Sequence, residues 1–215
     1  AQESWIIHNE SQYWGRKERG TADQLYIVYR TLENNKYLGQ SINILFVDAG
    51  KCFDKLWLKD CLVTLWQKGM NAEDVDLLYQ MDKSAWVTVE TPIGATKEFM
   101  VDEIVKQGTV WGPKMCCATT DEINKFSEDT GSSIGTMNID CRVFVDDMAS
   151  IGDKTTIKNT VNGCNYFEQY KKFTFSAEKS QILRVGEKDK DDDEQLDKKK
   201  GHIKDTNKYR YLGDI

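Results

Sequence analysis

The chain has 215 residues, of which 40% are hydrophobic and 30% are charged, and its net charge is −6 at pH 7. These values are typical of a folded protein with its own hydrophobic core. No apolar run approaches the ~20 residues that span a bilayer, and no signal peptide is predicted at the start. The acidic balance argues against a general nucleic-acid coat protein, which is usually basic.

The six cysteines indicate a reducing compartment. None forms a C-x-x-C pair and each lies in an apolar segment, which is typical of buried free thiols. The two histidines, His8 and His202, lie far apart in the sequence, which does not favour a zinc site. We therefore expect an intracellular protein, in the nucleus or the cytoplasm, with no membrane partner.

The predicted elements mix helices and strands along the chain. Apolar residues at helical spacing predict helices, and β-rich apolar runs bounded by turn residues predict strands. The predicted helices are 21–35 with Thr21 as N-cap, 54–69, 71–84 with Asn71 as N-cap, 112–127 and 155–173. The predicted strands are 42–50, a hairpin over 85–101, a strand–turn–strand over 141–152, and strands or strand ends in 174–185 and 209–215. This order predicts an α+β fold in which helices cover one face of a sheet.

Two strand-like apolar runs end in carboxylates. The run ILFVDAG ends at Asp48, and VFVDD ends at Asp146 and Asp147. If these strands are neighbours, three like charges converge at one sheet edge and repel strongly. Divalent cations relieve this repulsion, and two Mg²⁺ ions about 3.5–4 Å apart can activate a hydroxyl and stabilise a leaving pyrophosphate. The alternative is that all three acids are strand-end turn residues, where Asp is favoured.

Six short motifs lie in order along nearly the whole chain. SQYWGRKERGTADQL is similar to Q-x-G-F-R-x-G-R-[SG]-T, and FVDAGKCFDKLW is similar to D-x-x-K-A-F-D. IVKQGTVWGPKMCC is similar to Q-G-x-x-x-S-P, and FVDD to the [YF]-[AV]-D-D box. FSAEKS is similar to N-x-x-K-T, and YRYLG to a Y-L-G motif. In this order the motifs resemble those of reverse transcriptases, in particular those of non-LTR retrotransposons.

The resemblance implies a polymerase palm with an antiparallel sheet packed on helices, partial fingers and no thumb. Residues 1–40 would be the partial fingers, and 41–215 the palm, interrupted by a charged loop at about 187–205. The part of this loop at 187–200 carries seven acids and five lysines, which predicts a solvated loop. Further domains, such as a thumb or an endonuclease, would be missing or supplied elsewhere.

The resemblance also implies the metal ligands and a steric gate. Asp48 and Asp146 would bridge two Mg²⁺ ions, or Mn²⁺ in their place, with Asp147 as a weaker ligand. Phe53, five positions after Asp48, would fill the space that a ribose 2′-hydroxyl needs and so favour deoxynucleotides. The alternative for Phe53 is an ordinary core side chain.

The remaining site residues would contact the nucleotide. Gln107 and Gly108 would lie along the incoming dNTP and the template, where glycine allows close backbone approach. A third residue, Lys51, would face the triphosphate from the turn after Asp48. Lys179 resembles the lysine proposed to protonate the departing pyrophosphate.

Two arginines in the fingers motif, Arg16 and Arg19, are candidates to hold the triphosphate, because a planar guanidinium suits phosphate oxygens. The motif departs from the family pattern around them, with Trp14-Gly15 in place of Gly-Phe and Glu18 in place of glycine. For both arginines, and for Lys179, the alternative is a solvated surface charge.

The resemblance implies an RNA-directed DNA polymerase that extends a DNA primer on an RNA template with dNTPs. The alternative is an inactive reverse-transcriptase-like module that serves as a scaffold or binding partner, which the acidic charge, the altered fingers motif and the expected absence of a thumb favour. A more distant alternative is an RNA-templated RNA polymerase, against which Phe53 at the gate position argues.

Overall fold

The computed structural model describes residues 11–50, 52–102, 105–106, 108–124, 132–134, 137–139, 141–171, 173–186 and 201–213. The helices are α1 (Thr21–Leu38), α2 (Cys52–Lys55), α3 (Leu58–Gln67), α4 (Ala72–Asp82), α5 (Gly112–Asn124) and α6 (Lys154–Lys171). The strands are β1 (Ile42–Val47), β2 (Ser84–Val87), β3 (Glu90–Thr91), β4 (Gly94–Ala95), β5 (Phe99–Asp102), β6 (Ser132–Ile134), β7 (Met137–Ile139), β8 (Cys141–Phe144), β9 (Asp147–Gly152), β10 (Gln181–Val185) and β11 (Lys204–Thr206). Three predicted features, namely Lys51, Gln107 and the charged stretch 187–200, lie outside the described residues.

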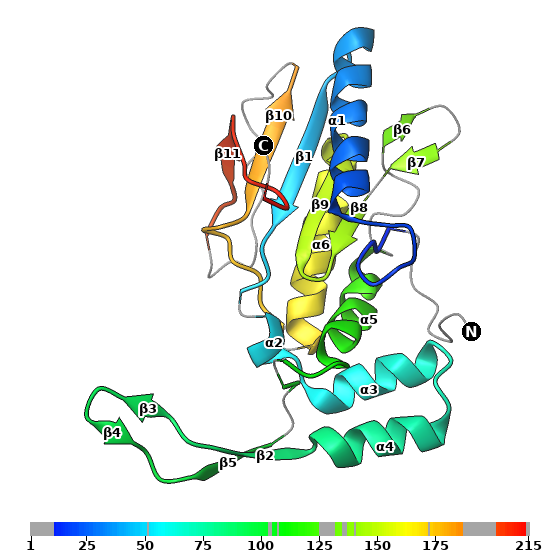
Figure 1. Ribbon diagram of the computed structural model, residues 1–215. Helices are drawn as coiled ribbons and strands as arrows, with labels where there is room; N and C mark the ends of the chain where they lie inside the picture. The colour runs from blue at the N-terminus through cyan, green and yellow to red at the C-terminus, as the bar shows by residue number, and fades with distance from the viewer. Residues whose placement is uncertain are drawn as a thin grey trace.

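A five-stranded sheet in the order β11-β10-β1-β9-β8 organises the chain (Figure 1). The central strand β1 pairs antiparallel with both β10 and β9, and β8 and β9 form a hairpin. The predicted α+β class and the largely antiparallel sheet are confirmed. The exception is β11, which runs parallel to β10. Because Lys204–Thr206 is a strand, the charged loop expected at about 187–205 does not extend over those residues.

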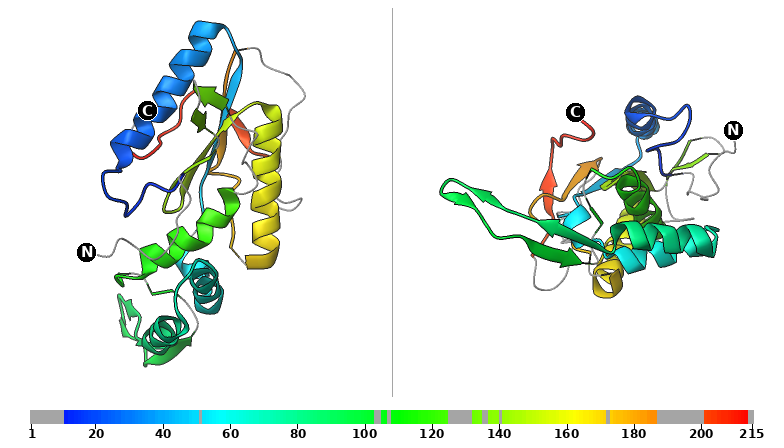
Figure 2. Two further views of the ribbon diagram at one scale, coloured as in Figure 1. Left: turned by 90° about the vertical axis from the view of Figure 1, so that its right-hand side faces the viewer. Right: turned by 60° about the horizontal axis from the view of Figure 1, so that its bottom comes forward.

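Both faces of this sheet are covered by helices, so the expectation of helices on one face is wrong. Figure 2 shows α1 on one side of the sheet and α6 on the other. Along β1, Ile44 and Phe46 pack in one hydrophobic cluster with Val28 of α1. Leu45 and Val47 pack in the other cluster, which includes α6 side chains. A strand that is apolar in both directions buries both of its faces, and each face needs a covering layer.

The helix ends lie within a few residues of the predicted ones, and two larger differences concern the cap of α1 and the 54–69 helix. Gly20, rather than Thr21, is the N-cap of α1, and its N–H donates to the Asp23 carboxylate (2.8 Å). The helix predicted over 54–69 is divided into α2 and α3, with Leu56 buried between them. The predicted Asn71 cap of α4 is confirmed.

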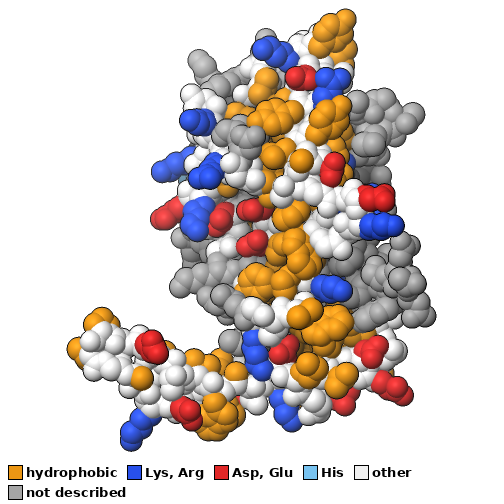
Figure 3. Space-filling view, in the orientation of Figure 1, with side chains coloured by type: hydrophobic (Ala, Val, Ile, Leu, Met, Phe, Trp, Pro, Cys, Tyr) orange, Lys and Arg blue, Asp and Glu red, His pale blue; other side chains and the backbone are white. Residues whose placement is uncertain are grey.

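The predicted hairpin over 85–101 is confirmed as an arm that extends from the body of the molecule (Figure 1). It carries exposed hydrophobic side chains, including Trp86 and Ile93. Figure 3 shows such side chains along the arm and in a stripe over the sheet and helices. Within the described residues, no helix combines the length and apolarity that crossing a membrane requires.

Candidate active site

Three aspartates meet at one end of the sheet because of the strand register. Val47 of β1 pairs with Met148 of β9, so Asp48 follows β1 directly beside Asp147. In the β8–β9 hairpin, Phe144 pairs with Asp147, which leaves Val145 and Asp146 as the two turn residues. The two predicted strand ends are therefore neighbours, and their acids converge.

The turn that presents Asp146 has an unusual backbone. Val145 has φ 63°, in the left-handed region that a β-branched residue rarely adopts. A positive φ at the first turn residue is the requirement of a type II′ hairpin turn, which matches the twist of the paired strands. Such conformations cost on the order of 1–3 kcal/mol and persist where surrounding contacts hold them.

Asp48 is held by the turn that precedes β10. Its N–H donates to Ser180 Oγ (3.2 Å), and its carbonyl oxygen accepts from the Ser176 N–H (2.9 Å). In the same turn, Lys179 Nζ lies 3.5 Å from Asp48 Oδ1. The structure thus brings Lys179 beside Asp48, and its role as a proton donor stays a prediction.

The carboxylates influence one another. Burial raises the pKa of Asp146, and the negative charge of Asp48 raises it further. A hydrogen bond with the Asp146 backbone partly lowers it again. Burial, followed by the charges of Asp146 and Asp48, raises the pKa of Asp147 to about 6. In both cases the surroundings disfavour the ionised carboxylate. A nearby positive charge would therefore stabilise the cluster.

The chemistry of these side chains fits a divalent cation. Asp48 Oδ1 is buried and accepts no hydrogen bond, and its neighbour of opposite charge is the Lys179 ammonium at 3.5 Å, so a divalent cation would share this oxygen with the lysine. Carboxylate oxygens are the ligands that Mg²⁺ prefers. Among the described residues, however, no group of three or more His, Cys, Asp and Glu side chains is arranged to hold a metal ion. The acids that fit the ion are therefore adjacent, but they do not form a ready-made set of three ligands.

Phe53 lies in α2, directly after the Asp48 turn. It is half-buried and packs against the larger hydrophobic cluster. A Cβ atom at Gly112, the first residue of α5, would lie 3.6 Å from Phe53 Cε1, so the ring borders the start of that helix. Gly108 lies in the preceding turn with φ +82° and is exposed. Thr109 closes this turn, since its Oγ1 accepts from the Gly112 N–H (3.1 Å).

The two arginines lie in the segment that joins the β8 edge to α1. They are in the turn segment before α1, which follows a short bridge between Gln12 and Val143 at the β8 edge. The Arg19 guanidinium lies over the Tyr13 ring at 5.0 Å, in a cation–π contact. Asp48, by contrast, follows β1, and β9 separates β1 from β8. The role of Arg16 and Arg19 at a triphosphate stays a prediction.

Two residues at the site were not singled out from the sequence. Tyr209 stacks on Phe46 (ring centroids 4.3 Å apart, interplanar angle 8°). Burial, and then the charges of Asp48 and Asp147, raise the Tyr209 pKa to about 12, which places its hydroxyl near the acids. The second residue is Gln12, whose Oε1 accepts from the Val145 N–H (3.3 Å). Tyr209 belongs to the YRYLG motif and Gln12 to the fingers motif. Their place in these motifs was the sequence feature that could have indicated a position at the site.

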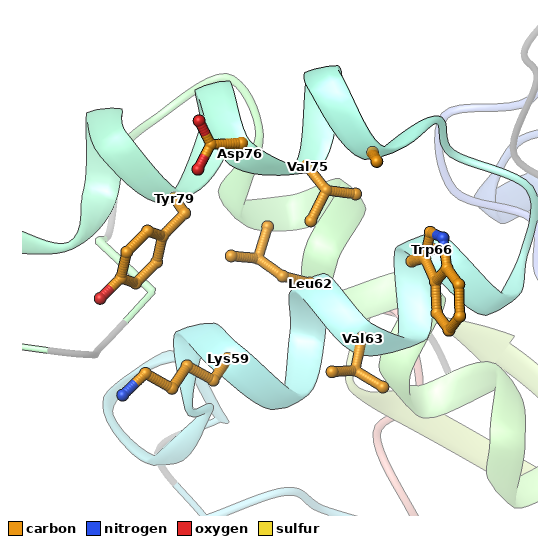
Figure 4. A pocket seen from close by; sticks show the side chains of 8 residues that line it. Lys59, Leu62, Val63, Trp66, Val75, Asp76 and Tyr79 are labelled. Carbon is orange, nitrogen blue, oxygen red and sulfur yellow. The ribbon is translucent and has the colours of Figure 1, made fainter.

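A separate groove lies between α3 and α4 (Figure 4). It has a volume of about 440 Å³ and is lined mainly by apolar side chains, with Leu62 and Val75 facing each other across it. Lys59 and Asp76 are the charged residues of its lining. None of the predicted site residues lines this groove, so it is not the place of the predicted chemistry.

The two-sided sheet and its acidic end define a polymerase palm as the class of protein. The chain belongs to the reverse transcriptase family, because the family described as "Reverse transcriptase (RNA-dependent DNA polymerase)" matches residues 5–214. None of the curated proteins compared with the chain matches it.

Solved telomerase structures from Candida tropicalis share the fold. The apo enzyme truncated from its C-terminal domain is 16% identical with a TM-score of 0.59, over 86% of this chain and 38% of that one. The complex with the TWJ fragment of telomeric RNA is 14% identical with a TM-score of 0.59, over 81% of this chain and 30% of that one. A further apo structure is 14% identical with a TM-score of 0.55, over 82% and 33% of the two chains. The chain therefore spans less than two fifths of these proteins, and the likeness concerns the fold alone.

Proposed function

We propose that this chain is the palm and partial fingers of an RNA-directed DNA polymerase, which transfers nucleotides from dNTPs to a primer 3′-hydroxyl on an RNA template. The observation that carries the proposal is the convergence of Asp48, Asp146 and Asp147, with Lys179 beside Asp48, in a member of the reverse transcriptase family. In this proposal residues 1–40 belong to the fingers and 41–215 to the palm. The non-LTR branch rests on the six sequence motifs.

In the proposed reaction, Asp48 and Asp146 hold the divalent cations, Mg²⁺ or Mn²⁺, and Asp147 assists. When bound, the ions would lower the pKa of the attacking hydroxyl and neutralise charge on the phosphates. Because carboxylates bind cations in their ionised form, cation binding would release the proton that Asp147 keeps below about pH 6.

The other predicted residues act on the nucleotide. Phe53, at the border of α5, would exclude a ribose 2′-hydroxyl. The ammonium of Lys179 would donate a proton to the departing pyrophosphate. Gln107 and Gly108 would lie along the nucleotide and template, while Lys51, Arg16 and Arg19 would contact the triphosphate. A thumb and other domains would come from elsewhere in a larger protein.

A second candidate function is a binding module without catalysis. The net charge of −6 favours it, because a primer–template duplex is itself strongly negative. The lack of a preformed three-ligand group within the described residues also favours it.

Primer extension on poly(rA)–oligo(dT) with Mg²⁺ and dTTP separates the two candidates. Template-dependent incorporation that EDTA abolishes supports the polymerase. Binding of the primer–template without incorporation, at any Mg²⁺ concentration and at low salt, supports the binding module instead.

A further inference from the structure

We propose that Gln12 is a positioning residue that holds the backbone of the acidic hairpin tip; its consequence for catalysis rests on the proposed function. Its side chain is fully buried at 0% exposure. The carboxamide oxygen accepts from the Val145 N–H and from the Trp14 N–H, both at 3.3 Å. Val145 immediately precedes Asp146, so this contact is made to the turn that presents the predicted metal ligand.

The orientation of the Gln12 carboxamide follows from its partners. Both partners are backbone N–H donors, so the atom that they share is the oxygen and not the nitrogen. The Gln12 nitrogen makes no hydrogen bond in the structure. The attachment of this buried amide is therefore through its oxygen, to the hairpin tip on one side and to its own segment on the other.

The main chain brings Gln12 to the hairpin independently of its side chain. The Tyr13 N–H donates to the Val143 carbonyl (3.1 Å), and the Val143 N–H donates to the Ser11 carbonyl (3.0 Å). These bonds attach the segment to the β8 edge. Removing only the carboxamide should leave the segment in place and affect the turn alone.

The hydrogen bond from Val145 to Gln12 acts on a turn whose backbone conformation is strained. Val145 is held at φ 63°, a conformation that its β-branched side chain disfavours. The backbone angles of Val145 set the direction in which the next residue, Asp146, leaves the turn. An acceptor on the Val145 N–H stabilises the conformation that directs Asp146 toward the end of β1. We expect a weaker hold on this turn to reduce turnover and to raise the Mg²⁺ concentration required.

Amide hydrogen exchange measured by NMR tests the contact without relying on activity. In Gln12→Met the Val145 amide should exchange on the order of tenfold faster, because its acceptor is lost. The Tyr13 and Val143 amides should keep their protection. Gln12→Glu keeps an acceptor oxygen and should restore protection of Val145. Gln24→Met, which removes another fully buried glutamine that donates to the Tyr211 hydroxyl, should leave Val145 unchanged.

Single-nucleotide incorporation gives the second measurement. Gln12→Met should lower kcat and raise the half-saturating Mg²⁺ concentration, with the KM for dNTP unchanged and with recovery in Gln12→Glu. Unchanged exchange of Val145 in Gln12→Met would overturn the proposal, and so would equal loss of protection at Tyr13 and Val143. A wild-type chain without incorporation would count against the proposed function, whereas the exchange result would still decide whether Gln12 holds the tip.

Discussion

Lys179 Nζ lies 3.5 Å from Asp48 Oδ1, although the two residues are far apart in the sequence. The contact arises because the turn before β10 also binds the backbone of Asp48 on both sides, through Ser180 and Ser176. The Lys179 side chain is 70% exposed, so solvent screens the pair and its contribution to stability is small. The ion pair therefore contributes little to the free energy of unfolding, and the proton-donor role of Lys179 stays a prediction to be tested by its rate effect.

Lys179→Met should lower the rate of nucleotide incorporation by roughly 100-fold, the lower end for loss of a general acid. The melting temperature should change little, because an exposed ion pair contributes about 0–1 kcal/mol. Rapid-quench kinetics and thermal unfolding measure the two effects. Lys158→Met, at an exposed position of α6, is the matched control. An unchanged rate in Lys179→Met would contradict the proton-donor role.

Asp147 should make stability depend on pH in the absence of metal. Its pKa is about 6 in the folded chain, against 3.8 for the ordinary group. Between these pH values the folded state keeps a proton that the unfolded state has lost. The stabilisation is therefore complete below about pH 4 and is lost as the pH rises through 6.

Asp147→Asn removes this dependence. The free energy of unfolding of the variant minus that of wild type should therefore rise by about 1 kcal/mol between pH 4 and pH 7. The figure is kept small because Asp147 is exposed over part of its surface although its carboxylate lies against the sheet end, so solvent screens part of the effect. Urea unfolding in EDTA at both pH values measures it. A stability difference between variant and wild type that stays constant with pH would contradict the raised pKa.

Phe53→Ala should increase incorporation of ribonucleotides relative to deoxynucleotides, because the ring that borders Gly112 no longer excludes the 2′-hydroxyl. A half-buried ring also contributes to packing, so we expect a stability loss below the roughly 3–5 kcal/mol of a fully buried Phe→Ala change. The ratio of kcat/KM for rNTP and dNTP is the measurement. Tyr79→Ala, at another partly buried aromatic on the same cluster, controls for the packing loss. Equal discrimination in Phe53→Ala and wild type would refute the gate.

Tyr209→Leu should destabilise the chain by about 1 kcal/mol, because it removes the parallel stack on Phe46. Tyr209→Phe keeps the ring and should remain close to wild type in stability. Urea unfolding at neutral pH compares the three proteins. If Tyr209→Leu is as stable as wild type, the stack does not hold the C-terminal segment against the sheet.

The convergence of the acids could be predicted because Asp48 and the Asp146–Asp147 pair each end an apolar strand. The periodicity of a strand does not show which other strand lies beside it. The order of the motifs, through the resemblance to reverse transcriptases, indicated that these two strands are neighbours. The contact between Gln12 and Val145 could not be predicted, because it joins residues from opposite parts of the chain through a buried amide.

The division of the predicted 54–69 helix also escaped sequence reasoning. The helical spacing continues across Leu56, but Trp57 is extended (φ −81°, ψ 127°) and is the N-cap of α3, so tertiary context overrides local propensity. The strand predicted over 209–215 is not a named strand within the described residues. There, Tyr209 and Tyr211 pack against Phe46, so aromatic contacts rather than a β-ladder attach this segment to the sheet.

The most direct test of the central claim is primer extension by the wild type, Asp146→Asn and Glu33→Gln on poly(rA)–oligo(dT) with Mg²⁺ and dTTP. Loss of the predicted metal ligand removes several kcal/mol of charge stabilisation, so Asp146→Asn should be slower by at least about 100-fold. Glu33→Gln, which also removes one negative charge but lies exposed on α1, should match wild type. Equal incorporation by wild type and Asp146→Asn would contradict the assignment of the acidic hairpin as the catalytic centre.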